Sequence, residues 1–103
     1  MTRAAVFTWP GRRPGDFSHD LVLDFLAADI QVNPGAAAEL VAHLEAVESG
    51  AEPEWRRIGN LYDLRLSAEG ASLENIYDEG CKGVASLADF ATAARAWRRY
   101  VGD

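Results

Sequence analysis

The sequence has a single cysteine, Cys81, and no uninterrupted apolar run of the roughly 20 residues that a membrane-spanning helix needs. One thiol cannot form an intramolecular disulfide, whereas small secreted domains are commonly stapled by several. The N-terminal residues also lack the apolar core that a signal peptide carries behind its positive end. These absences predict a protein of the reducing cytoplasm.

Basic residues are scarce as well. The 103 residues contain 10 Lys+Arg against 16 Asp+Glu, for a net charge of −6. Proteins that bind nucleic acid or dock on anionic membranes rely on Lys and Arg, so the composition disfavours both classes. The length and the average hydrophobic content predict one globular domain, residues 1–103.

The charge is unevenly distributed along the chain. Residues 1–15 contain three arginines and no acid, residues 16–55 contain nine acids and no Lys or Arg, and residues 56–103 contain seven of each sign. A stretch of 40 residues without a base allows two interpretations. It is either a solvated face or a surface that meets a basic partner, because complementary potentials accelerate and select encounters.

Two helices are predicted from their capping signals. Asn33 and Pro34 suit the N-cap and the first helical position, and Gly50 suits the helix end, which predicts a helix to about Ser49. Ser86, with an acid three residues later, predicts the start of the last helix. Each helix has one apolar stripe, so each is expected to bury that side against another part of the domain.

Strand formers and turn residues alternate through much of the rest of the chain. The segments predicted as strands are residues 4–9, 55–58, 61–66 and 71–77, with a tight turn at Gly59-Asn60 and a polar loop at 78–83. Residues 19–26 fit two patterns. Alternation suggests a strand, and Leu21, Val22, Phe25 and Leu26 equally form a helical stripe. We favour the strand because a clear helix start follows at Asn33.

These elements predict an α+β fold, with a mostly antiparallel sheet of four to five strands and two helices packed on it. Aromatic residues supply much of the expected core: Phe7, Phe25, Tyr62, Phe90 and Trp97.

The residue types that carry chemistry do not form a recognisable active site. Cys81 has neither histidine near it in the sequence, and the acids around His19 (Asp16, Asp20 and Asp24) lack the spacing of a metal motif. Asp78 and Glu79 could form a paired-carboxylate site with Glu74, but acids in a glycine-containing loop are expected to be solvated. We therefore expect no catalytic residue, no metal and no cofactor.

Trp9 and Trp55 are the large apolar side chains least clearly assigned to the core. Acids and bases flank Trp55, a composition typical of an aromatic anchor within an interface rim. The alternative is a half-buried aromatic residue on a strand.

From Ala36 onward, a series of sequence blocks resembles small bacterial YacL-like proteins and the single-domain immunity proteins encoded beside polymorphic or contact-dependent toxins. The blocks are Glu45-Ala46-Val47-Glu48-Ser49-Gly50, Trp55-Arg56-Arg57-Ile58-Gly59-Asn60-Leu61-Tyr62-Asp63-Leu64, Leu73-Glu74-Asn75-Ile76-Tyr77-Asp78-Glu79, Ser86-Leu87-Ala88-Asp89-Phe90 and Ala96-Trp97. The resemblance covers about two-thirds of the chain.

The resemblance implies a non-enzymatic protein that binds a cognate toxin and blocks its active site or substrate groove. A basic nuclease is the natural target for an acidic domain. The residues expected to bind this partner are Asp20, Asp24, Glu39, Glu45, Glu48, Trp55, Glu74, Asp78 and Glu79.

Two other classes stay open. One is an enzyme or ligand-binding domain that uses Cys81, a histidine or the loop at 78–83. The other is a structural module that forms a homodimer through an exposed strand edge.

Overall fold

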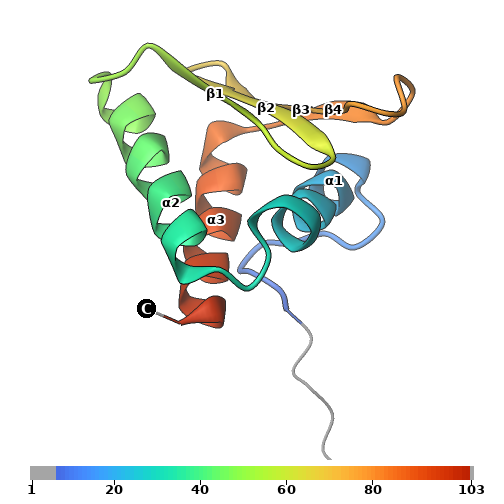
Figure 1. Cartoon of the computed structure of the whole chain (residues 1–103), viewed down its shortest axis with the longest axis horizontal. Coiled ribbons are helices and arrows are strands. Elements are labelled where there is room, and N and C mark those ends of the chain that lie inside the picture. Colours follow the sequence, from blue (N-terminus) through green and yellow to red (C-terminus); the bar gives the residue numbers. More distant parts are fainter. Residues whose placement is uncertain (1–6, 103) are drawn as a thin grey trace, which may run out of the picture.

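The computed structural model describes residues 7–102 as three α-helices, a short π-helical segment and one four-stranded sheet (Figure 1). In chain order the elements are α1 (Phe17–Phe25), η1 (Leu26–Ile30), α2 (Pro34–Ser49), β1 (Glu54–Ile58), β2 (Tyr62–Ser67), β3 (Gly70–Asn75), β4 (Lys82–Ala85) and α3 (Leu87–Val101). The predicted α+β class is confirmed.

The sheet is fully antiparallel, with its strands in the order β1-β2-β3-β4. All three helices lie against one face of it, and no described element covers the other face (Figure 1). Burial alternates accordingly along β2, where Tyr62, Leu64 and Leu66 are buried and Arg65 is exposed. An antiparallel sheet with one dry and one wet face is the common solution for a chain with short connections.

The strand favoured for residues 19–26 is wrong, because this segment belongs to α1 and η1. The Asp16 side chain caps α1 by accepting hydrogen bonds from the backbone N–H groups of Ser18 and His19, at 3.0 and 3.2 Å. The helical stripe then buries Leu21, Val22, Phe25 and Leu26. A strand and a helix would each bury apolar residues of this segment. The cap at Asp16 and the contacts with the rest of the core favour the helix. The fold therefore has three helices where two were expected.

The first predicted strand is wrong where it can be compared. Phe7, Thr8 and Trp9 form no strand, and residues 4–6 lie outside the described part of the chain. Trp9 packs beside the His19 ring, with ring centroids 5.7 Å apart, and the Arg12 guanidinium lies 5.4 Å from its ring centre. The segment is held by side-chain packing rather than by a strand partner.

The start and end predicted for α2 are confirmed. The Asn33 side chain accepts a hydrogen bond from Ala36 N at 3.1 Å, and the helix ends at Gly50. The start of α3 is confirmed too, since Ser86 Oγ accepts a hydrogen bond from Asp89 N at 3.0 Å. The carboxylate of Asp89 does not complete a capping box. It meets His19 Nε2 instead, at 3.2 Å.

The hairpin of β1 and β2 is confirmed, with a three-residue connection at 59–61 in place of two. Two boundaries differ further along. β3 ends at Asn75, so residues 76–77 leave the sheet, and the expected loop at 78–83 already contains the start of β4. β4 is short and includes Lys82 and Gly83, so its pairing with β3, rather than an apolar pattern of its own, makes it a strand.

The core is aromatic, as predicted. The rings of Tyr62 and Phe90 lie 6.3 and 6.0 Å from that of Phe25, and all three side chains are fully buried. Trp97 is buried and its Nε1 donates to Gln31 O at 2.9 Å, while Phe7 is half-buried with its ring 4.8 Å from that of Trp97. None of the helices described for residues 7–102 is long and apolar enough to cross a membrane.

A buried carboxylate joins the helical N-terminal half to the sheet. Asp29, only 6 % exposed, accepts hydrogen bonds from the backbone N–H groups of Leu61 and Tyr62, both at 2.9 Å. Gly59 leaves the space for it, because a Cβ at Gly59 would lie 2.5 Å from Asp29 Oδ2. The β1–β2 turn is thus built around the side chain of a residue on η1.

Replacing Asp29 with alanine is expected to lower the free energy of unfolding by about 3 kcal/mol, because it leaves two backbone donors without a charged acceptor. Asp29→Asn retains one oxygen and is expected to lose less. Urea unfolding followed by circular dichroism measures both. Glu39→Ala, which removes an exposed acid, is the control and is expected to change stability by no more than about 0.5 kcal/mol. Equal stability of Asp29→Ala and this control would contradict the proposed role of the carboxylate.

Candidate functional site

The arginines near the N-terminus fold back on the first acids of the 16–55 stretch. Arg12 forms an ion pair with Asp20 at 3.1 Å, and Arg13 forms one with Asp16 at 2.9 Å. Hydrogen bonds from Ser18 and Arg13 hold the pKa of the Asp16 carboxyl well below its usual range. Asp20 is therefore exposed but already balanced by a base.

The acids of α2 are mostly paired as well. Arg95 of α3 lies 2.6 Å from Glu48 and 3.6 Å from Glu45, and these contacts raise the pKa of the Arg95 guanidinium. Glu39 remains exposed, with no ion pair to another described residue. The expected acidic face is thus divided into local ion pairs across this part of the molecule.

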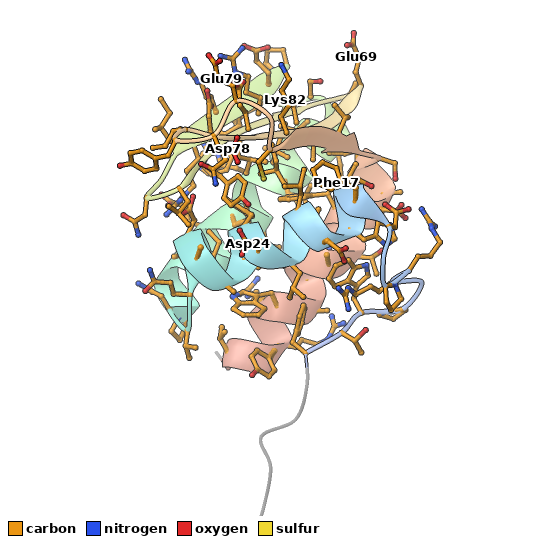
Figure 2. The ribbon with its side chains drawn as sticks, turned by 90° about the vertical axis from the view of Figure 1, so that its right-hand side faces the viewer. Phe17, Asp24, Glu69, Asp78, Glu79 and Lys82 are labelled. Carbon is orange, nitrogen blue, oxygen red and sulfur yellow. The ribbon has the colours of Figure 1, made fainter. Side chains whose placement is uncertain are left out.

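Besides Glu39 and Glu74, three of the expected partner-binding acids form no ion pair within residues 7–102: Asp24 on α1, and Asp78 and Glu79 in the β3–β4 loop. All three lie on one side of the molecule (Figure 2). We call them the acidic surface. Glu74 is exposed nearby on β3, but it stands directly opposite Lys82 in the strand register.

Packing of α1 against β4 brings the acidic surface together. A Cβ at Gly83 would lie 3.0 Å from Leu21 Cδ1 and 3.7 Å from Phe17 Cδ2. Phe17, Leu21 and Asp24 follow one another at helical spacing, so the face that meets Gly83 also directs Asp24 toward the sheet. Gly83 permits this close approach because it lacks a side chain.

Asp24 is fixed by a hydrogen bond rather than an ion pair. The Tyr62 hydroxyl donates to Asp24 Oδ2 at 2.5 Å. Burial raises the pKa of the Tyr62 phenol, and the Asp24 carboxylate and the Cys81 thiol raise it further. A shallow hollow of about 440 Å³ beside this contact is lined by Asp20, Leu23, Asp24 and Ala27.

Trp9 and Trp55, the two tryptophans not clearly assigned to the core, both have partners within the domain. Trp9 is 4 % exposed and belongs to the core, so it is not available as an anchor. Trp55 is half-buried and stacks on His43 of α2, with ring centroids 4.3 Å apart and planes 5° apart. This placement matches the alternative of a half-buried strand aromatic.

The residues considered for catalysis or metal binding do not converge. His19 is buried, with Nδ1 accepting from Arg13 N at 2.9 Å and Nε2 facing Asp89. His43 Nδ1 is 2.8 Å from Glu52. Cys81 lies instead beside Tyr62, and no cluster of His, Cys, Asp or Glu in the described chain has the arrangement of a metal site.

The open strand edges belong to β1 and β4. Both strands are short, and they carry Glu54, Arg56 and Lys82. Short length and charged side chains discourage the pairing of sheet edges between molecules. This geometry does not favour the homodimer.

Comparison of the chain with protein-family models, with curated proteins and with solved structures finds no match.

Sequence reasoning missed the exposure of Tyr77, which it placed within the strand predicted at 71–77. Asn75 ends the strand first, because its side chain accepts a hydrogen bond from Tyr77 N at 2.8 Å. An asparagine that precedes a run of acids and glycine is a turn signal that could have marked this change of direction.

The raised pKa of Tyr62 predicts a loss of stability at alkaline pH. The phenol of the unfolded chain ionises near pH 10.0, while the folded phenol stays protonated. Its contribution to stability is therefore complete below that pH and declines as the pH rises further. Tyr62→Phe is expected to remove this part of the decline, measured by urea unfolding at about pH 9 and about pH 11. Tyr100→Phe is the control for loss of one phenol, and identical pH slopes for Tyr62→Phe and the unaltered chain would contradict the assignment.

Proposed function

We propose that this chain is a cytoplasmic, non-enzymatic immunity protein that binds a cognate toxin and blocks it. The toxin is a basic protein, and a nuclease is the target that fits best. The observation that carries the proposal is the set of unpaired carboxylates on one side of the molecule, the acidic surface of Asp24, Asp78 and Glu79. Elsewhere in the described chain, most acids of the 16–55 stretch have a basic neighbour.

Two properties of the acidic surface support binding to a basic protein. Its carboxylates stand on two different elements, α1 and the β3–β4 loop, so they present negative charge over an area rather than at one point. Such an area attracts a Lys- and Arg-rich groove and steers its approach. A nuclease groove is positively charged because it binds phosphates, so these carboxylates can take the place of phosphates within it.

The position of the surface supports obstruction as the mechanism. The β3–β4 loop extends from one end of the sheet, beyond the helical layer (Figure 1). A projecting, negatively charged loop can enter a substrate groove, while the body of the domain covers its rim. Inhibition of this kind needs no reaction, only a stable complex that excludes substrate.

Charge reversal within the acidic surface tests this function. The double variant Asp78→Lys and Glu79→Lys is expected to slow association with the purified product of the adjacent gene by about tenfold or more at low salt. The affinity of the unaltered chain is expected to fall as salt increases. Surface plasmon resonance at several salt concentrations measures both effects.

The matched control is Glu39→Lys with Glu54→Lys, which changes two exposed acids on α2 and β1 by the same total charge. It is expected to change the association rate much less. Equal effects of the two double variants would show that net charge alone acts. Absence of a complex with the unaltered chain, or an affinity indifferent to salt, would refute the proposed function.

A further inference from the structure

Tyr77 is the most exposed large apolar side chain in the described structure, at 78 %. Its side chain has no hydrogen bond or ring contact with any residue from 7 to 102. Its neighbour Ile76 is exposed as well. Burial of an exposed aromatic ring by a partner lowers the free energy of the complex, and tyrosine is enriched among the residues that dominate binding.

The backbone around Tyr77 is already ordered in the free chain. Asn75 Oδ1 accepts from Tyr77 N at 2.8 Å, and Asp78 Oδ1 accepts from Gly80 N at 3.1 Å. Cys81 N donates to Asp78 O at 3.0 Å, and Asn75 N donates to Cys81 O at 2.9 Å, which closes the loop. A loop held this way loses little conformational entropy when it binds.

The charges next to Tyr77 determine which partner fits. Asp78 and Glu79 follow it directly, and both are exposed on the same side of the molecule as Asp24 (Figure 2). A hydrophobic or acidic cavity would have to desolvate these carboxylates without compensation. A concave site lined with Lys or Arg can pair with them while its floor receives the ring.

We infer that Tyr77 is the anchor of the interface, inserting into a concave, positively charged site of the protein partner while Asp78 and Glu79 pair with the rim of that site. The inference rests on the proposed function and adds to it the residue that supplies most of the affinity. The acids govern the rate of encounter, and the ring governs how long the complex lasts.

A comparison of two tyrosine variants tests the anchor. Tyr77→Ala is expected to weaken binding to the purified adjacent-gene product by at least about 30-fold, mainly through faster dissociation. Tyr77→Phe keeps the ring and is expected to retain most of the affinity. Tyr100→Ala, at the far end of α3 from the sheet, is the control and is expected to bind as the unaltered chain does.

Thermal unfolding separates binding from folding. Because the Tyr77 side chain has no partner in the described chain, Tyr77→Ala is expected to unfold at the same temperature as the unaltered chain. If Tyr77→Ala binds normally while the double variant of Asp78 and Glu79 associates slowly, the anchor is refuted and the proposed function stands. If neither change affects binding, both are refuted.

A photoreactive group identifies the partner in the cells from which the chain comes. Benzoylphenylalanine in place of Tyr77 is expected to form a crosslink to a basic protein, and the same group in place of Tyr100 is not. A crosslink only from position 100, a crosslink to a second copy of this chain, or none from either position would overturn the inference. A crosslink from position 77 to an acidic protein would keep the anchor and refute the toxin-neutralising function.

Discussion

The hydrogen bonds from Leu61 and Tyr62 to the buried carboxylate of Asp29 join the helical N-terminal half of the chain to the start of the sheet. They fix the start of β2 relative to η1, and so the position of α1 over the sheet. The contact of α1 with Gly83, and the hydrogen bond from Tyr62 to Asp24, both depend on that position. Asp29 thereby helps to position Asp24 of the acidic surface relative to the sheet.

The fate of the other acids explains why bulk charge is a poor guide to the surface. Asp16 caps a helix, Asp20 meets Arg12, and Glu48 meets Arg95. A run of like charges in the sequence becomes a set of local ion pairs, because Arg12 and Arg13 fold back on its first acids and α3 brings Arg95 to it from a distant position. Asp24 on α1 and two acids in a loop from the other half of the chain form no ion pair and lie on one side of the molecule, and they are the proposed interface.

Local signals predicted the parts of the fold that local chemistry controls. Asn33, Gly50 and Ser86 act through backbone groups within a few residues, so α2 and α3 begin where the sequence indicates. The strand predicted at 19–26 failed because its apolar pattern fits two periods, and β4 was missed because its pairing partner is what makes it a strand. The candidate site was predicted in part: Asp24, Asp78 and Glu79 were among the residues proposed, but so were Glu45 and Glu48, whose pairing with Arg95 no sequence pattern shows.

The sequence by itself determined the α+β class, both ends of α2, the start of α3 and the aromatic core, because caps, turns and apolar periodicity act over short distances along the chain. Only the tertiary structure decided that residues 17–30 are helical, that Trp9 is buried, and that Asp24 lies on the same side of the molecule as a loop more than 50 positions away. It also decided that Tyr77 faces water. Each of these outcomes depends on contacts between distant segments, and the free energy of such contacts cannot be predicted from the sequence of either segment alone.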